Sequence, residues 1–304
     1  MKNQEIIPTI LISGASGLLG HELVTQLLEN GNFKVIAITS KQKELATEFQ
    51  SYSNLQVVKV DNWKEEIESN TQIDTFINCA FPRSSEPQQL SHGLLFTEKI
   101  IKDVLNLKIN KIINVSSQSV YSQKSKSLTD ETAPIVPETL YGMTKYASER
   151  IIAAMCQNIA FSNIRLASLT SLDFEVRMTN RFVKSALTGK PIVINGGQQK
   201  VSYLDVRDAA SALIEMLNKD SSLWKSVYNL GNHHSCTVLE LAEMVKKQAD
   251  IYTNKSVKLD ILEGQHNFNN LINSELFYSD FNWEPQFNMN KMIEELFDYY
   301  KERV

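Results

Sequence analysis

A glycine-rich loop that directly follows an apolar run constrains the fold of this chain more than any other feature. Residues 9–13 (TILIS) are apolar and β-branched, as is typical of a buried strand. Gly14, Gly17 and Gly20 follow at once, and residues 17–29 have the pattern of a helix. Strand, glycine loop and helix in this order begin a parallel βαβ unit. Its glycines allow a tight turn, the approach of a pyrophosphate to the backbone and close helix–strand packing.

The start of this predicted helix is also a site for phosphate. Its first backbone N–H groups have no partner within the helix, and the helix dipole is positive at this end. A glycine-rich turn without a ligand is the alternative, but the position of the motif directly after the first strand favours a nucleotide. We therefore predict that a dinucleotide contacts Gly14, Ser16, Gly17, Leu18, Leu19 and Gly20.

Strand and helix patterns alternate through the first half of the chain. Further strands are predicted at residues 34–39, 55–60, 74–78, 111–115 and 161–166, and helices at 63–68, 90–107 and 141–157. Such alternation is typical of a parallel sheet with helices on both faces. We therefore predict an α/β fold, with a Rossmann-type doubly wound parallel sheet that binds NAD(P) over residues 1–167.

The pattern changes after residue 167, where the predicted elements become shorter and more mixed. Helices are predicted at residues 176–189, 204–217, 237–248 and 288–300, and extended segments at 191–194 and 227–230. Thr237 and Glu240 have the spacing of a capping box. We expect residues 168–304 to form a smaller, interleaved α+β substrate-binding domain. Parts of it, such as residues 204–230, can pack back on the first domain.

Polar residues follow the predicted strands, at the edge where ligands bind in such sheets. The second strand is followed by Thr39, Ser40 and Lys41, with no acidic residue for the adenosine ribose. A 2′-phosphate is therefore not repelled, which favours NADP over NAD, although an exposed loop lysine explains Lys41 equally well. Asp61 and Asn62 follow the third strand, where Asp61 either accepts from the adenine amino group or caps a helix.

The loop after the fourth predicted strand reaches the same edge. Cys79 and Ala80 begin it, and we expect both to lie against the cofactor. Arg83 follows and can face a substrate, although a surface arginine is the simpler interpretation. The fifth strand brings Ser116 and Ser117 to this edge as well.

Tyr141 and Lys145 are four residues apart in a predicted helix and therefore lie on one face of it. An ammonium group at that spacing lowers the pKa of the phenol, which suits a tyrosine that moves protons near neutral pH. Taken alone, the pair is also explained as an aromatic residue at a helix start and a solvated charge. The rest of the chain favours the catalytic interpretation.

Composition and charge exclude other classes of function. The formal net charge is −4, so there is no basic surface for nucleic acid. The cysteines Cys79, Cys156 and Cys236 lack zinc spacing and a disulfide pattern, which indicates a reducing cytoplasm and no metal site. Residues 1–8 lack the apolar core of a signal peptide. No apolar run reaches the ~18 residues that span a bilayer, so no membrane partner is expected.

Together these motifs resemble the extended short-chain dehydrogenase/reductase family, in its sugar-nucleotide epimerase/dehydratase branch. The resemblance covers nearly the whole chain. It rests on Gly14-x-x-Gly17-x-x-Gly20, Ser117-Gln118-Ser119-Val120-Tyr121, Tyr141-x-x-x-Lys145, residues 201–210 (VSYLDVRDAA), Tyr228-Asn229-Leu230-Gly231 and Asn282-Trp283-Glu284-Pro285.

The resemblance implies a nicotinamide cofactor that moves a hydride to or from a sugar carbon. Tyr141 is then expected to be the acid/base, Ser117 to hydrogen-bond the reacting oxygen, and Lys145 to bind the nicotinamide ribose. A symmetric homodimer is also implied, in which the helices at 90–107 and 141–154 pair with their copies. Substrate contacts are expected from Arg83, Ser117, Gln118, Ser168, Arg181 and Lys200.

Three departures from the family pattern narrow the chemistry. Family dehydratases carry an Asp-Glu pair where this chain has Gln118-Ser119, so elimination of water lacks its acid and base. An arginine for the substrate's diphosphate is missing from residues 261–264, and Lys200 replaces another, which loses the bidentate contact. Leu95-Phe96 replaces an asparagine–glycine pair, which changes the packing near the site.

We therefore predict an NAD(P)-dependent sugar-nucleotide epimerase or 4-ketoreductase that transfers a hydride at C4 of the sugar. Residues 39–41 favour NADP and hence reduction, whereas the overall resemblance favours epimerisation. Two alternatives stay open: a non-catalytic NADP-sensing protein with this fold, and a reductase of a carbonyl substrate that is not a sugar. Retention of Ser117, Tyr141 and Lys145 argues against the sensor.

Overall fold

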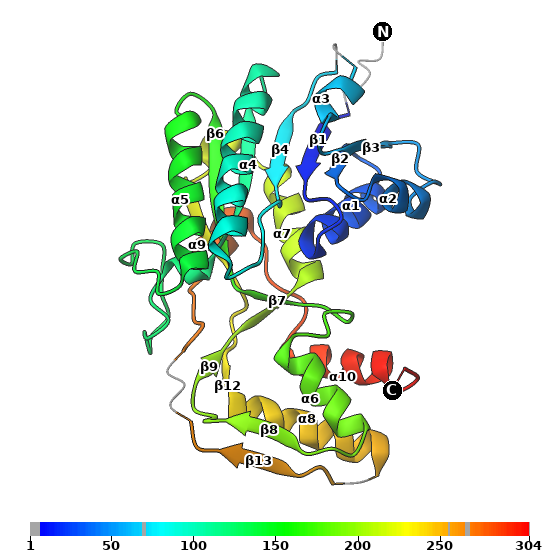
Figure 1. The fold of residues 1–304 in the computed structure, drawn as a ribbon, viewed down its shortest axis with the longest axis vertical. Coiled ribbons are helices and arrows are strands. Elements are labelled where there is room, and N and C mark those ends of the chain that lie inside the picture. Colours follow the sequence, from blue (N-terminus) through cyan, green and yellow to red (C-terminus); the bar gives the residue numbers. More distant parts are fainter. Residues whose placement is uncertain (1–6, 69–70, 255, 265–267, 304) are drawn as a thin grey trace. The chain divides into compact units, whose positions relative to one another are not determined.

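The structure is a computed structural model that describes residues 7–68, 71–254, 256–264 and 268–303 (Figure 1). The chain divides into two compact units. The first comprises residues 1–120, 137–165 and 210–228, and the second residues 121–136, 166–209 and 229–304. The predicted boundary between two domains, at residues 167 and 168, stays a prediction. Residues 1–6, which make up most of the N-terminal stretch that lacks the apolar core of a signal peptide, lie outside the described residues.

Seven strands form the main sheet, in the order β11-β6-β5-β4-β1-β2-β3. They are β1 (Thr9–Ser13), β2 (Lys34–Thr39), β3 (Leu55–Lys59), β4 (Thr75–Asn78), β5 (Lys111–Ser117), β6 (Ala160–Leu166) and β11 (Val227–Leu230). The pairs β1–β2, β2–β3, β1–β4 and β4–β5 are parallel. The prediction of a doubly wound parallel sheet is therefore confirmed.

The order of the strands places a switch point between β1 and β4. From β1 the chain proceeds outward through β2 and β3, then returns to β4 and proceeds in the opposite direction. Ser13 and Asn78, the last residues of β1 and β4, are opposite each other in register. Ligands of open α/β sheets bind beyond the carboxyl ends of the strands at such a point. The loops that start at Gly14 and Cys79 therefore leave the sheet where a cofactor is expected.

Helices of the first unit cover this sheet. They are α1 (Leu18–Asn30), α2 (Gln42–Glu48), α3 (Trp63–Glu66), α4 (Pro87–Asn106) and α5 (Leu140–Met155). The long helices α4 and α5 lie side by side (Figure 1) and pack against each other. Their buried faces, which include Ile101, Val104 and Ile152, join Phe76 and Ile112 of the sheet in one apolar core. Burial of this core is the main driving force for the unit.

A row of hydrogen-bonded polar side chains crosses the buried sheet of the first unit. Ser13 Oγ donates to Asn78 Oδ1 at 2.7 Å, Asn78 Nδ2 to Asn114 Oδ1 at 2.9 Å, and Asn114 Nδ2 to Asn163 Oδ1 at 2.8 Å. Asn163 Nδ2 in turn donates to the carbonyl of Ser226 at 3.3 Å. These four side chains are at most 2% exposed, so each depends on its neighbour for hydrogen bonds.

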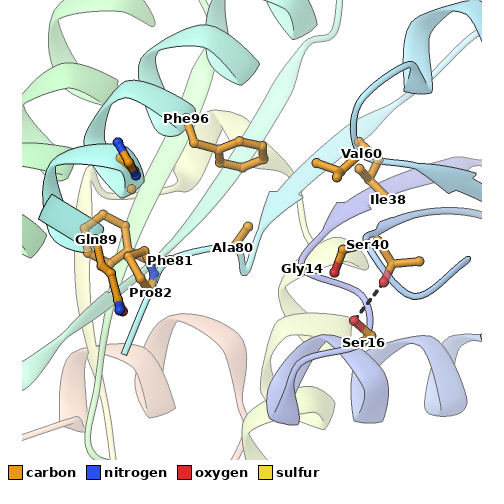
Figure 2. Close-up of a pocket in the computed structure, with 13 residues that line it drawn as sticks. Gly14, Ser16, Ile38, Ser40, Val60, Ala80, Phe81, Pro82, Gln89 and Phe96 are labelled. Carbon is orange, nitrogen blue, oxygen red and sulfur yellow. Dashed lines mark hydrogen bonds between the residues drawn. The ribbon is translucent and has the colours of Figure 1, made fainter. Parts of the chain in front are cut away.

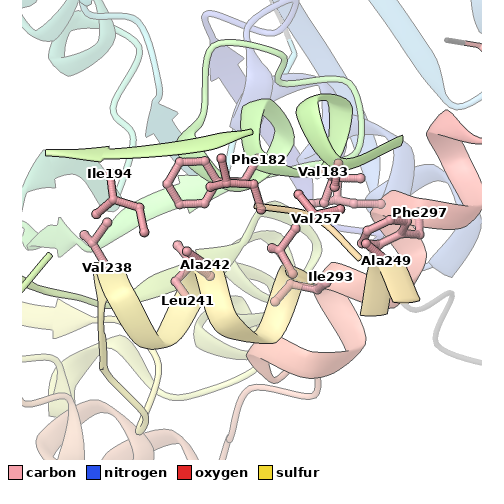
Figure 3. Packing of buried hydrophobic residues seen from close by; sticks show 14 of the residues in the cluster. Phe182, Val183, Ile194, Val238, Leu241, Ala242, Ala249, Val257, Ile293 and Phe297 are labelled. Carbon is pink, nitrogen blue, oxygen red and sulfur yellow. The ribbon is translucent and has the colours of Figure 1, made fainter. Parts of the chain in front are cut away.

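The second unit has its own apolar core (Figure 3). It is formed by α6 (Met178–Leu187), β8 (Ile192–Asn195), α8 (Val238–Thr253) and α10 (Met289–Tyr300), and β13 (Leu259–Leu262) pairs with β8 in parallel. Ile192 and Ile194 point into the core and Val193 is exposed, as the alternation of a strand requires. The predicted capping box of Thr237 and Glu240 starts α8.

The described residues contain further elements. They are β7 (Ser168–Thr170) paired with β10 (Tyr203–Asp205), β9 (Lys200–Val201) paired with β12 (Cys236–Thr237), α7 (Val206–Leu217), α9 (Glu275–Phe281), and the 3₁₀ turns at Gln118–Val120 and Ser221–Leu223. In the second unit Asp208 accepts from the backbone N–H groups of Gln286 and Phe287, both at 2.9 Å. This carboxylate therefore joins the motif at residues 201–210 to the two residues that directly follow the Asn282–Pro285 motif.

The predicted elements need three corrections. The helix expected from residue 204 begins at Val206, because Tyr203–Asp205 pairs as a strand with β7. The helix expected from residue 90 begins at Pro87, where a proline costs no hydrogen bond. The sequence analysis missed α2, α9, β7, β9, β12 and β13, which are short elements with a weak periodic pattern.

The row of amides generates a prediction for stability. Asn114→Ala should lower the free energy of unfolding by about 2 to 4 kcal/mol, because it leaves Asn78 and Asn163 each without a buried partner. The measurement is urea unfolding followed by circular dichroism. Asn106→Ala, at the exposed end of α4, is the matched control and should change stability by less than about 0.5 kcal/mol. Equal effects of the two substitutions would contradict the proposed importance of the row.

Candidate functional site

The glycine loop is shaped by two close approaches of the backbone. Gly14 has φ +71°, and a Cβ atom there would lie 2.8 Å from the backbone nitrogen of Ala80. At Gly20 of α1, a Cβ would lie 2.2 Å from the Gly14 carbonyl oxygen. Gly17 is the N-cap of α1, so Leu18 and Leu19 begin the helix. The loop therefore requires glycine for a left-handed turn and for close packing of helix on strand.

A cavity of about 420 Å³ opens beside this loop (Figure 2). Five of the predicted cofactor residues line it, namely Gly14, Ser16, Thr39, Ser40 and Ala80. Its remaining lining residues, which the sequence analysis did not predict, are Ile38, Val60, Phe81, Pro82, Gln89, His92, Gly93 and Phe96. Figure 2 shows Phe96 on one side of the cavity and Val60 and Ile38 on the other. A mostly apolar cavity with hydroxyl groups at its edge suits a nucleoside.

A helical pattern could have identified one wall of this cavity. Gln89, His92 and Gly93, and Phe96 are spaced as i, i+3, i+4 and i+7, so they form one face of α4. Gly93 is close to the loop after β4, because a Cβ there would lie 2.5 Å from Pro82 Cδ. Phe96, one of the two residues that replace the family's asparagine–glycine pair, thus forms part of the cavity wall.

The predicted residues after β2 and β3 have different surroundings. Thr39 Oγ1 donates to Ser16 Oγ at 2.7 Å and accepts from the Lys41 backbone N–H at 3.0 Å. The Lys41 side chain is exposed and is outside the cavity lining. Asp61 does not cap α3, since Asn62 is the N-cap, and the Asp61 carboxylate instead pairs with Lys59 Nζ at 3.2 Å.

Ser117, Tyr141 and Lys145 meet at the carboxyl end of the sheet. Ser117 is the last residue of β5 and hydrogen-bonds the Tyr141 phenol, while its Oγ also accepts from the Ser119 backbone N–H at 3.1 Å. The buried Lys145 Nζ donates to the Val115 carbonyl at 2.5 Å and lies 4.3 Å from the centroid of the Phe81 ring. The Phe81 and Tyr141 rings are in an edge-to-face arrangement, with centroids 6.2 Å apart.

Close packing fixes the start of α5 against the end of β5. Thr139 is the N-cap of α5 and its side chain accepts from the Gly142 backbone N–H at 3.0 Å. A Cβ at Gly142 would lie 2.1 Å from the Ser119 carbonyl oxygen. The first turn of α5, which carries Tyr141, therefore lies directly against the turn that follows Ser117.

Burial has the largest effect on the pKa values of Tyr141 and Lys145. Desolvation raises the pKa of Tyr141 above its usual 10.0, while the charge of Arg83 and the hydrogen bond from Ser117 oppose this rise. Desolvation lowers the pKa of Lys145 from 10.5 to about 8, and Glu149 and Cys79 oppose that shift. The sequence analysis predicted that Lys145 lowers the pKa of Tyr141. That direction is wrong for this geometry. Burial affects the pKa of the phenol more than nearby charges do, and the cation that lowers this pKa is Arg83.

The other predicted site residues are divided between the two units. Cys79 is half-buried, and desolvation raises the pKa of its thiol to about 12. Gln118 is buried in the 3₁₀ turn after β5. Ser168, Arg181 and Lys200 belong to the second unit, on β7, α6 and β9. Their predicted contacts with a substrate stay predictions.

Two classes of feature are absent from the described part of the chain. Within residues 7–68, 71–254, 256–264 and 268–303, no three His, Cys, Asp or Glu side chains gather in a group that could hold a metal ion. None of the helices in these ranges combines the length and the apolar character needed to cross a bilayer.

Comparisons with known proteins agree with this geometry. A sequence model of the NAD dependent epimerase/dehydratase family matches residues 10–231. The chain is 26% identical over 275 residues to the bifunctional polymyxin resistance protein ArnA of Wigglesworthia glossinidia brevipalpis, covering 81% of this chain but only 42% of that protein. It is also 26% identical over 259 residues to a putative UDP-glucose 4-epimerase of Methanocaldococcus jannaschii, covering 79% of this chain and 82% of the relative.

A solved structure shares the fold over nearly all of the chain. The UDP-glucuronic acid 4-epimerase of Bacillus cereus, in complex with UDP-glucuronic acid and NAD, has 20% sequence identity and a TM-score of 0.79. The match covers 97% of this chain and 100% of that one. Because the family model spans most of the chain, in a range that includes the glycine loop, Ser117, Tyr141 and Lys145, the chain belongs to the NAD dependent epimerase/dehydratase family.

Proposed function

We propose that the protein is an NAD(P)-dependent sugar-nucleotide epimerase or 4-ketoreductase that transfers a hydride at C4 of the sugar. The observation that carries the proposal is the group Ser117, Tyr141 and Lys145, which lies at the same end of the sheet as the glycine loop. The relatives from Methanocaldococcus jannaschii and Bacillus cereus support the substrate class, because their names specify UDP-sugars.

The residues present fit a dinucleotide. Gly14 and Gly20 keep the loop free of side chains, the start of α1 provides N–H groups for a pyrophosphate, and the adjoining cavity has room for a nucleoside. When bound, the nicotinamide supplies or accepts the hydride. In this proposal Lys145 holds the nicotinamide ribose, and Thr39, Ser40 and Lys41 are near the adenosine ribose.

Tyr141 moves the proton that must accompany each hydride. As the sugar hydroxyl is oxidised to a ketone, its proton goes to the Tyr141 phenolate, and the neutral phenol that forms returns a proton when the ketone is reduced. Ser117 hydrogen-bonds the Tyr141 phenol, and in this proposal it also hydrogen-bonds the reacting oxygen of the sugar. Since burial raises the pKa of Tyr141, the neutral phenol suits the step that donates a proton to the ketone.

The neighbouring residues argue against dehydration. Removal of water from the sugar needs an acid for the leaving hydroxyl and a base for the neighbouring proton. The two residues after Ser117 are Gln118 and Ser119, which cannot serve as this pair near neutral pH. Epimerisation and carbonyl reduction need only Tyr141 and Ser117, and both therefore remain in the proposal.

A second candidate is a reductase of a carbonyl substrate that is not a sugar nucleotide. It is favoured by Lys200, an exposed residue where the family carries an arginine, and by residues 261–264, which contain none. A screen against UDP-, dTDP-, GDP- and CDP-sugars, including 4-keto forms, with and without NADPH, separates the candidates. Turnover of a sugar nucleotide without added cofactor would indicate an epimerase. Inactivity on every sugar nucleotide would favour the second candidate.

Tyr141→Phe tests the proposed acid/base. The substitution removes the hydroxyl and keeps the ring, so turnover should fall by roughly 100-fold or more while the melting temperature changes little. Steady-state kinetics and thermal melts are the measurements. Tyr146→Phe, on the same helix and also partly buried, is the matched control and should retain activity. Folded Tyr141→Phe protein with wild-type turnover would refute the assignment.

Lys41→Ala tests the preference for NADP. If Lys41 contacts the 2′-phosphate, NADP affinity should fall about tenfold, or about 1.4 kcal/mol, while NAD affinity should be unchanged. Isothermal titration calorimetry measures both. Lys43→Ala, two residues further on and also exposed, is the control. The proposal fails if the unmodified protein binds NAD at least tenfold more tightly than NADP.

We also propose a symmetric homodimer formed by α4 and α5. Leu95 of α4 and Met143 and Leu140 of α5 are 60%, 50% and 42% exposed, which is unusual for large apolar side chains on adjacent helices.

Light scattering at tens of micromolar should give twice the 34.5 kDa mass of the chain. Leu95→Glu with Met143→Glu should yield monomers, whereas Leu223→Glu, at a site that is 70% exposed, should not. A monomeric unmodified protein would exclude the dimer.

A cytoplasmic location is part of the proposal. It is supported by Cys79, Cys156 and Cys236, which are all free thiols, as a reducing compartment would keep them. Localisation of a tagged protein in its host cell tests this expectation, and an extracytoplasmic protein would contradict it.

A further inference from the structure

A buried ion pair joins α5 to β6 within the first unit. The carboxylate of Glu149 and the guanidinium of Arg165 belong to residues that are 3% and 4% exposed. Arg165 donates from Nε to Oε1 at 3.0 Å and from Nη2 to Oε2 at 2.7 Å. A buried pair of this kind is weak evidence for stability, because desolvation costs about as much as the attraction gains. Its position therefore invites another explanation.

The pair is attached to the strand that carries Ser117. Ser116 Oγ donates to Glu149 Oε1 at 2.5 Å, and Lys145 Nζ donates to the preceding carbonyl, that of Val115, at 2.5 Å. Lys145 and Glu149 are one turn apart on α5, so two successive residues of β5 contact two successive turns of the helix. The carboxylate thus has a fixed position on the helix face that carries Lys145.

Of five ionisable groups around Lys145, three can carry a negative charge and two carry a positive one. Tyr141 and Glu149 are on its own helix, the Cys79 thiol and Arg83 are on the loop after β4, and Arg165 is on β6. Tyr141 and Cys79 are both protonated at neutral pH, since burial raises the pKa of each. Glu149 and Cys79 are the groups whose charge acts on Lys145, so near neutral pH only Glu149 supplies a negative charge.

We propose that Glu149 is a positioning residue for the proposed reaction: fixed by Ser116 and Arg165, it supplies the counter-charge that keeps the buried Lys145 ammonium protonated and oriented at the site. The inference rests on the proposed function only for the role given to Lys145. Without Glu149, the cost of burying the ammonium is no longer offset, so Lys145 loses its proton at lower pH.

The test follows the Lys145 amine itself. The protein is labelled with [ε-¹³C]lysine, and the Lys145 resonance, assigned by its loss in Lys145→Met, is followed against pH by NMR. In the unmodified protein its midpoint should be at about 8. Glu149→Gln should move it down by about one pH unit or more, a tenfold change in proton affinity. Ser116→Ala removes one of the two groups that fix Glu149 but keeps its charge, so it should move the midpoint much less than Glu149→Gln.

Two further variants keep the inference testable if Glu149→Gln does not fold. Glu149→Gln combined with Arg165→Gln removes both buried charges and should still lower the midpoint, by less than Glu149→Gln alone, because the repulsion of Lys145 by Arg165 is lost as well. Glu149→Asp keeps the charge and should restore most of the original midpoint. A folded Glu149→Gln or double variant with an unshifted Lys145 midpoint overturns the inference.

Kinetics link the shift to catalysis and separate the two proposals. The alkaline limb of kcat/KM should move down with the NMR midpoint in Glu149→Gln, whereas a merely structural role would lower the melting temperature without moving the limb. A shifted midpoint together with full activity of Tyr141→Phe would mean that the proposed function is wrong while the Glu149–Lys145 coupling holds. A shifted midpoint with an unshifted limb would overturn the positioning role.

Discussion

The hydrogen-bonded row of Ser13, Asn78, Asn114 and Asn163 is the interaction on which the rest of the first unit depends. It joins β1, β4, β5 and β6 in the buried sheet, where an unpaired amide would cost about 1 to 3 kcal/mol. A slip of one residue in any of these strands would break the row and leave buried polar groups without partners. The row therefore specifies the register in which the strands end.

That register sets the positions of the site's parts. Gly14 follows Ser13, the loop toward Phe81 follows Asn78, and Ser117 is three residues after Asn114. The left-handed turn at Gly14 and the contact between Gly142 and Ser119 then bring α1 and α5 against the strand ends without intervening side chains. The same fixed strand ends define the cavity and the group around Tyr141.

Burial, more than local charge, sets the chemistry of this group. Lys145 is nearly as inaccessible as the core, and its ammonium is satisfied by the Val115 carbonyl, the Phe81 ring and the charge of Glu149. The spacing of Tyr141 and Lys145 indicated that they share a helix face, and they do. It could not indicate that desolvation would raise the pKa of the phenol, because desolvation depends on residues that the chain brings together from other strands.

The sequence by itself determined the parallel α/β sheet, the glycine loop, the main helices and the family, because these follow from local periodicity and from residues close together in the chain. It could not identify Phe81, Val60 and Phe96 as walls of one cavity, since they come from three different segments and have no pattern in common. Nor could it pair β8 with β13 or Glu149 with Arg165. Those contacts join segments that approach only when the sheet and its helices pack, so only the tertiary structure decided them.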